Sequence, residues 1–264
     1  MKKPFSFIPI VVFLSSCLSY APQNVAGTNP EITLREQWEA GRLISNSQDG
    51  ALVVIGVASR HVVREDEITA AKNHAARKVA MFYGMRGSVE STMRAGLDVF
   101  GFYFNSQTSI RNIVDYEQFI ERLQFDPDRD VLTIDGGTLV RFRYEAMVTR
   151  VNFIGTMDND SRPNWLDDRY LPELDGYIVA VGVSQNQLWL RDTVMLSAQA
   201  AALKLIENMS TRLRTTDVYV PGIGFISETL TISEGGLDNF RVLEFWINPR
   251  NRHVYTLGIA RFVE

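Results

Sequence analysis

The chain of 264 residues has few of the side chains that usually build reactive sites. It contains one cysteine, Cys17, and three histidines, His61, His74 and His253. A single cysteine excludes an intramolecular disulfide. None of the histidines lies at metal-ligand spacing from another histidine or from the cysteine, so we expect neither a metal nor another cofactor. His74 is expected at the edge of the solvent face of a helix, and His61 in a polar loop.

Sequence motifs for common catalytic chemistry are also missing. Ser59 and Ser184 lack the Gly-x-Ser-x-Gly elbow of serine hydrolases, and neither a phosphate-binding glycine loop nor His-Glu-x-x-His occurs. Asp49 and Asp175 recur at equivalent places and could act as an acid–base pair. Each precedes a glycine and a strand, which favours turns instead. We therefore expect a protein that is not an enzyme, and a hydrolase is the most distant alternative.

The charge pattern argues against nucleic acid as a partner. Lysine and arginine number 27 against 31 acidic residues, giving a formal net charge of −4. The two signs are interspersed without a cationic stripe, whereas nucleic-acid binding relies on a basic patch.

The amino terminus has the pattern of an export signal. Lys2 and Lys3 are followed by an apolar run of about ten residues and then by Leu14-Ser15-Ser16-Cys17. This tetrad resembles the lipobox of bacterial lipoproteins, in which the thiol is alkylated by diacylglycerol. Residues 1–16 are thus predicted to be a signal peptide, Cys17 the lipidated residue, and 17–33 a flexible tether. The alternative is a buried strand with an incidental cysteine. Because Leu18-Ser19 contains no acidic residue, resemblance to lipoprotein sorting rules indicates the outer membrane.

After the tether the sequence repeats itself. Residues 49–59 and 175–185 align at an offset of 126, and the same offset aligns 75–79 with 201–205. Trp38 and Trp165 precede the two copies by similar distances. We predict an α+β fold with two tandem modules, 34–157 and 163–264, each a mostly antiparallel sheet with a long amphipathic helix packed on it.

The apolar pattern places the main elements. Each copy begins with a buried strand, followed by a helix near 68–82 or 194–213, for which Asp66 and Asp192 are candidate caps. Further predictions are a short helix at 116–123, a hairpin of 131–134 with 139–148, and strands at 97–104, 218–220, 224–232, 240–247 and 254–262.

Three stretches carry a family resemblance: Pro163-Asn164-Trp165, the run 176–184 with 198–203, and the closing turn and strand 251–262. They resemble the Lpp-twenty lipoprotein family, best over 163–264 and more weakly over 38–83. The first copy lacks the Pro-x-Trp opening and has a longer insertion. The resemblance implies an α/β-sandwich module on envelope lipoproteins. Relatives such as flagellar basal-disc lipoproteins and the N-terminal domain of flagellar assembly protein T support envelope or flagellar structures.

Four aromatic residues are the candidate interface or ligand contacts. Trp38 and Trp165 could stack on a sugar or a peptide, or could cover the end of the core. Phe102 and Phe104 lie in an aromatic run that is denser than one sheet face needs. The leading hypothesis is an envelope scaffold or assembly factor that contacts envelope proteins or its own copies. The alternative is a lipoprotein that binds peptidoglycan fragments or another small ligand between the modules.

Overall fold

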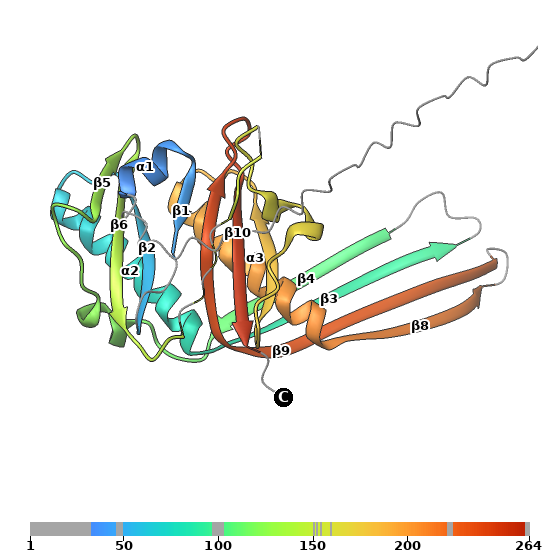
Figure 1. Cartoon of the computed structure of the whole chain (residues 1–264). Helices are drawn as coiled ribbons and strands as arrows, with labels where there is room; N and C mark the ends of the chain where they lie inside the picture. The colour runs from blue at the N-terminus through green and yellow to red at the C-terminus, as the bar shows by residue number, and fades with distance from the viewer. Residues whose placement is uncertain are drawn as a thin grey trace, which may run out of the picture. The chain divides into compact units, whose positions relative to one another are not determined.

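The chain folds as an α+β protein with mostly antiparallel sheets and few helices (Figure 1). The computed structural model describes residues 33–45, 50–96, 103–149, 151, 153, 155–158, 160–220 and 224–261. All of these belong to one compact unit, Ile32–Glu264. The predicted signal peptide, the lipidation site Cys17 and nearly all of the tether lie outside the described residues.

A three-stranded sheet has the order β2-β6-β5. Strand β2 (Ala51–Ser59) pairs with β6 (Gly137–Glu145) along its full length, and β6 forms a hairpin with β5 (Val131–Ile134). The tight turn at Asp135-Gly136 places Gly136 at φ +92°, a conformation that favours glycine. The sequence predicted this hairpin, and the structure confirms it.

A seven-stranded sheet is organised around one long strand, β9 (Gly224–Ile247). Its first half pairs with β8 (Thr211–Val220) and with β3 (Met85–Gly96), which in turn pairs with β4 (Tyr103–Asn112). Its second half pairs with β1 (Arg42–Ile44) and with β10 (Val254–Arg261), which pairs with β7 (Ile178–Ser184). One strand therefore belongs to two differently built regions.

The two long helices start at corresponding places. Helix α2 (Arg64–Tyr83) begins 126 residues before α3 (Leu190–Ser210). Each crosses a glycine of the preceding strand: a Cβ on Gly56 would lie 2.2 Å from the Ala71 carbonyl oxygen, and one on Gly182 would lie 2.2 Å from that of Ser197. These pairs are also 126 residues apart, so both helices approach their strands closely only because the strand carries glycine.

The helix ends differ in part from the expectation. Helix α2 follows Val63, which makes no side-chain cap, and Asp66 lies inside its first turn, as Asp192 does in α3. Helix α3 ends at Ser210, so Leu213 belongs to β8 rather than to the helix.

The short helix α1 (Leu34–Glu39) has a capping box between Thr33 and Glu36. The predicted helix near 116–123 is the 3-10 turn η1 (Glu117–Arg122); η2 (Asn164–Leu166) and η3 (Asp168–Tyr170) follow later.

The strands after the helices were predicted least well. Strand β3 follows α2 directly and was not expected. β8 is longer than 218–220, and 224–232 and 240–247 are parts of the single strand β9. The prediction of a strand at 97–104 falls mostly outside the described residues. Because β3 of the first predicted module pairs with β9 of the second along twelve residues, both modules share one sheet. Their division into two modules stays a prediction.

Candidate functional site

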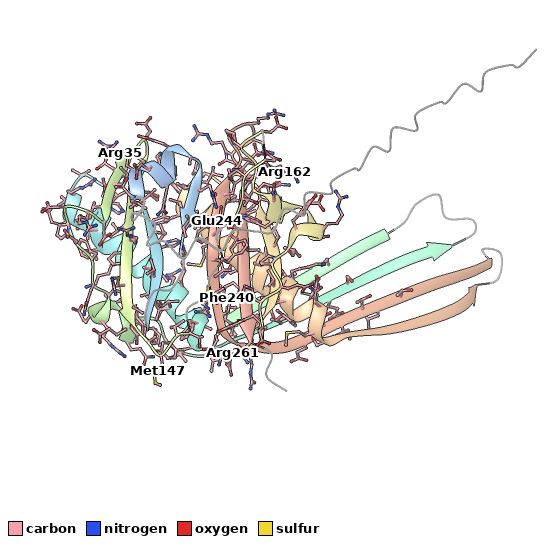
Figure 2. The ribbon with its side chains drawn as sticks, in the orientation of Figure 1. Arg35, Met147, Arg162, Phe240, Glu244 and Arg261 are labelled. Carbon is pink, nitrogen blue, oxygen red and sulfur yellow. The ribbon has the colours of Figure 1, made fainter. Side chains whose placement is uncertain are left out.

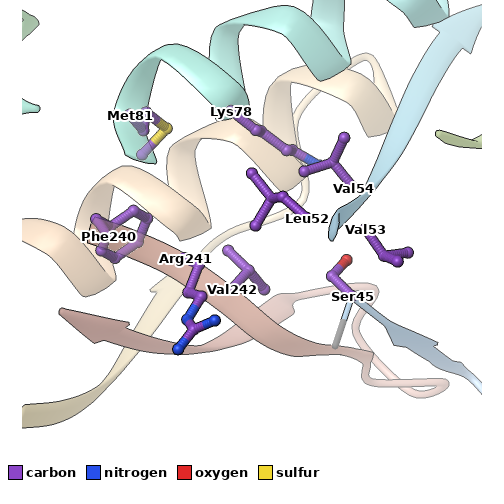
Figure 3. Close-up of a pocket in the computed structure, with 9 residues that line it drawn as sticks. All are labelled: Ser45, Leu52, Val53, Val54, Lys78, Met81, Phe240, Arg241 and Val242. Atoms are coloured by element: carbon purple, nitrogen blue, oxygen red, sulfur yellow. The ribbon is translucent and has the colours of Figure 1, made fainter. Parts of the chain in front are cut away.

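The seam between the two sheets encloses the first candidate site. It lies where the free edge of β2 faces β9, below helix α2 (Figure 3). The backbone N–H of Val57 donates to Nδ1 of His74 at 3.0 Å, and Nζ of Lys78 donates to the carbonyl oxygen of Ile55 at 2.7 Å. The two α2 side chains thus take the place of a neighbouring strand along this edge.

Burial shapes the protonation of both side chains. Burial lowers the pKa of Lys78 to about 7, and it lowers the pKa of His74 well below its usual range. The ammonium group of Lys78 also lies 4.4 Å from the ring centroid of Phe245. His74 is buried rather than at the edge of a solvent face, so that prediction was wrong. Its neighbours in sequence give no sign that the ring bonds β2.

The seam is too small to hold a ligand. Its free space is about 10 Å³, near the lower limit for a single water molecule. The walls are mainly the apolar side chains Leu52, Val54, Met81 and Phe240. Arg241 also borders it, and its guanidinium donates to Thr149 and Tyr177 at 2.9 and 2.7 Å. The seam therefore has a structural role, in which its apolar walls and the Arg241 hydrogen bonds hold the two sheets together.

A buried ion pair fixes a second polar cluster on β9. Nη2 of Arg42 donates to Oε2 of Glu244 at 2.8 Å and to the carbonyl oxygen of Gly155 at 2.8 Å. Figure 2 labels the position of Glu244. Burial raises the pKa of Glu244, while the hydrogen bonds and the positive charge of Arg42 oppose that rise. The indole of Trp165 lies nearby. The indole is so close that a Cβ on Gly155 would meet both Trp165 and Glu244. This cluster ties the segment before β7 to β9.

A third polar cluster joins the start of α2 to β6. Oε2 of Glu67 accepts from the hydroxyl of Thr138 and from Nη1 of Arg64, the latter at 3.0 Å, and Oε1 accepts from the backbone N–H of His61 at 3.1 Å. The Thr138 hydroxyl is the main reason that the pKa of Glu67 is lowered. All of these polar atoms are used within the protein, so the cluster has a structural role.

The predicted aromatic contacts do not come together. Trp165 is 1 % exposed, so neither face of its ring is open to a ligand. Trp38 is half-buried against the core formed around α3. Phe102 lies outside the described residues, and Phe104 lies in β4 but outside the described side chains. Asp175 belongs to a turn in which Gly176 has φ +71°, as the turn interpretation requires, while Asp49 lies outside the described residues.

The four strands β4-β3-β9-β8 form the most open part of the described structure. In Figure 1 they lie side by side and run beyond the end of α3. Each outer strand has a single neighbour among the described strands: β4 pairs with β3, and β8 pairs with β9. Both outer strands are ten residues long. Among the described strands none pairs with their outward backbone groups, so an additional strand can bond there.

The side chains at the base of this open sheet are polar. Ser106–Ser109 of β4 are exposed, and the hydroxyls of Ser88 and Ser109 lie 2.8 Å apart. Arg86 and Arg111 stand directly opposite each other on β3 and β4. An open hollow of about 770 Å³ borders these arginines together with Glu234 and Asp238. Sequence reasoning missed this region, although buried Met85, Gly87 and Val89 alternate with exposed or half-buried neighbours.

Comparisons with known proteins returned no relative: no family model, no curated protein and no solved structure matches the chain. Within the described residues, no helix is long and apolar enough to cross a membrane, and no cluster of three or more histidine, cysteine or acidic side chains could hold a metal ion.

Proposed function

We propose that the chain is a non-enzymatic lipoprotein of the cell envelope that serves as a scaffold or assembly factor. The lipid on Cys17 anchors it in the outer membrane, and the open sheet β4-β3-β9-β8 docks envelope proteins or further copies of the chain by strand addition. Two α+β modules, each with its helix on a sheet, form the body that carries this surface. The equal offset of both helix starts and of both glycine contacts supports the two modules.

The proposed assembly role rests on one observation, the contrast between the edge of β2 and the outer edges of β4 and β8. The edge of β2 is closed by His74 and Lys78, whereas the outer edges of β4 and β8 pair with no described strand. Soluble proteins usually cover or blunt long edge strands because free edges recruit other chains. Two long edges on one sheet are therefore best explained as binding surfaces. The resemblance to flagellar basal-disc lipoproteins makes a flagellar assembly the first structure to examine.

The anchor is tested by replacing Cys17 with serine. The wild-type chain should sediment with outer membranes, and Cys17→Ser should appear in the soluble fraction because it cannot be alkylated. Ser16→Ala is the matched control, since it changes a neighbouring small residue and keeps the thiol. A Cys17→Ser chain that stays in the membrane fraction would disprove the lipid anchor.

The docking surface is tested by crosslinking in intact envelopes. Photo-crosslinking side chains at Thr108 and Tyr219 sample the outer strands, and one at Leu196 on α3 is the control, because its side chain is exposed on a helix rather than on a sheet edge. We expect defined protein adducts from the two outer strands and none from Leu196. Equal adducts from all three positions would contradict a dedicated docking surface.

The alternative function is binding of peptidoglycan fragments, and the 770 Å³ hollow beside Arg86 and Arg111 favours it. Muropeptides carry carboxylates that paired arginines can bind. Calorimetric titration with a muropeptide, repeated with Arg111→Gln, separates the two functions. Binding that Arg111→Gln abolishes would favour the alternative, and no heat of binding would leave the assembly role in place.

A further inference from the structure

The two outer edges of the open sheet are complementary to each other in direction. Neighbouring strands in the order β4-β3-β9-β8 are all antiparallel, so β4 and β8 run in opposite directions. A second copy in the same orientation can therefore place its β4 beside β8 and continue an antiparallel sheet. An odd number of strands would not allow this, because the two edges would then run the same way.

The two edges lack three of the features that usually prevent strand addition. The sequences Tyr103–Asn112 and Thr211–Val220 contain no proline and no lysine, and their charged residues are Arg111, Arg212, Arg214 and Asp217. The pairings of β3 with β4, of β3 with β9, and of β8 with β9 run without a register shift. The β9–β10 pairing, in contrast, contains two shifts. Proline, lysine and bulges are common edge protections in native sheets, and these edges lack them.

The chain already contains a contact of the required kind. Strand β3 follows α2, and β8 follows α3, with Met85 and Thr211 again 126 residues apart. The hairpins β3–β4 and β8–β9 therefore occupy corresponding places. Inside the chain, the second strand of one hairpin (β9) pairs with the first strand of the other (β3). Pairing β4 with β8 of a neighbouring copy repeats the same relation between hairpins.

We propose that copies of this chain assemble head to tail through β8 of one copy and the β4 of the next. The partner at the open edges is a second copy, and each added copy contributes four strands to a continuous antiparallel sheet. Such a contact joins two different patches, so it generates a ring when the rotation closes and a filament when it does not.

The internal contact also predicts the register between copies. Thr211 and Val89 both pair with Ser233 of β9, so they lie at the same level in the sheet. Thr211 corresponds to Met85 in the repeat, and Val89 lies four residues beyond Met85. Each hairpin is thus staggered by four residues against the preceding one. Repeating that stagger places Thr215 of one copy opposite Asn112 of the next, and Tyr219 opposite Thr108. Six residue pairs, from Asn112 with Thr215 to Gln107 with Val220, then lie within both strands.

Head-to-tail pairing, unlike a symmetric dimer, keeps every copy in the same orientation. Pairing β4 with the β4 of another copy in antiparallel fashion would relate the two copies by a two-fold axis perpendicular to the sheet and reverse their strand directions. The proposed lipid anchor holds all copies in one orientation relative to the membrane, and head-to-tail pairing preserves that orientation. This step rests on the proposed function, whereas the strand directions and the stagger do not.

Directed disulfide formation in the full-length protein tests both partner and register. One preparation carries Thr108→Cys and a second carries Tyr219→Cys, and the two are mixed in mild detergent and oxidised. Directly opposed residues on antiparallel strands have Cα atoms about 4.5–5.5 Å apart, within reach of a disulfide. We expect a covalent dimer from the mixture and little from either preparation alone. A chain carrying both substitutions should give a ladder of higher oligomers.

The matched control pairs Thr108→Cys with Leu213→Cys, which changes the same strand six residues away, roughly 20 Å along it. It should not crosslink. Proline at Thr108 and at Ser109 gives a second measurement, because adjacent residues of β4 point their N–H groups alternately toward β3 and outward. The outward position should yield a folded monomer by circular dichroism and light scattering.

Several results would overturn the proposal. Crosslinking within the Thr108→Cys preparation alone would indicate a symmetric dimer, and equal crosslinking by Leu213→Cys would exclude the register. A monomeric wild-type protein without any crosslink would exclude self-assembly. If Cys17→Ser still leaves the membrane in that case, the anchor stands and only the second copy as partner is wrong.

Discussion

The helix-covered region and the open sheet satisfy their strand edges in opposite ways. Strand β2 is buried in eight of its nine residues, and α2 side chains bond its free edge. Strand β4 has exposed side chains from Ser106 to Ser109 and no described neighbour on its outer side. The same chain therefore closes the edge of β2 at the cost of burying Lys78, and leaves the outer edges of β4 and β8 without a described strand partner. The difference indicates that the first region provides stability and the second provides contacts.

The two regions should differ most in the free energy of unfolding that is lost when an arginine is replaced. Arg42→Met would leave Glu244 buried without its cation, and removing one partner of a buried ion pair costs about 3–5 kcal/mol. Arg111→Met changes an exposed arginine of the open sheet that stands opposite Arg86, so its effect should stay within about 0.5 kcal/mol. Urea unfolding of both variants measures the free energies. Equal losses would show that the two regions do not differ as described.

Glycine substitutions should give the next largest difference. A Cβ at Gly182 would lie 2.1 Å from the backbone nitrogen of Ala201, so Gly182→Ala must push α3 away from β7 and should cost about 1–3 kcal/mol. In the open sheet, a Cβ at Gly235 would meet Ile206 at 3.5 Å, an ordinary contact. Gly235→Ala should therefore change the thermal midpoint little. A larger loss from Gly235→Ala than from Gly182→Ala would reverse the comparison.

The smallest effect is a pH dependence that belongs to the helix-covered region. The pKa of Lys78 is about 7 in the folded protein, below its unfolded value of roughly 10.4. Between these values the unfolded chain binds more protons, so stability should rise with pH above about 7, by at most about 1.4 kcal/mol per pH unit. Below about pH 7 Lys78 is protonated in both states and adds no slope.

Urea midpoints measured between about pH 7 and pH 9 check this slope. Lys78→Met should flatten it, although it also removes the donor to the Ile55 carbonyl and so shifts the midpoint at every pH. Lys204→Met is the control, since Lys204 is on the exposed side of α3. A slope that survives in Lys78→Met would assign the pH dependence to another group.

The local sequence pattern was enough to predict the strands and helices that bury one continuous apolar surface. The run 51–59, the alanine-lined helices and the hairpin around Asp135-Gly136 were predictable because each has a strong period or turn signal. The hairpins β3–β4 and β8–β9 were missed or shortened. Their residues alternate weakly, and the pairing that joins the two hairpins is between β3 and β9, which lie more than a hundred positions apart.

The sequence pointed to residue types for the candidate site but not to where those residues lie in the fold. Aromatic residues drew attention to Trp165, yet its indole is enclosed beside Glu244 and Gly155. No local signal marks His74 and Lys78 as partners of β2, because their roles depend on how closely α2 lies over Gly56. The open edges of β4 and β8 follow from sheet order, which a single sequence does not specify.

The sequence by itself determined the export pattern that ends at Cys17, the 126-residue repeat, and the α+β pattern in which strands and helices segregate. Each of these features can be read from runs of neighbouring residues. Only the tertiary structure decided that β9 would serve two regions, which charges would be buried, and which sheet edges would stay free. Those outcomes depend on packing and hydrogen bonding between distant segments, where the free energy of each pairing is set by all of its neighbours.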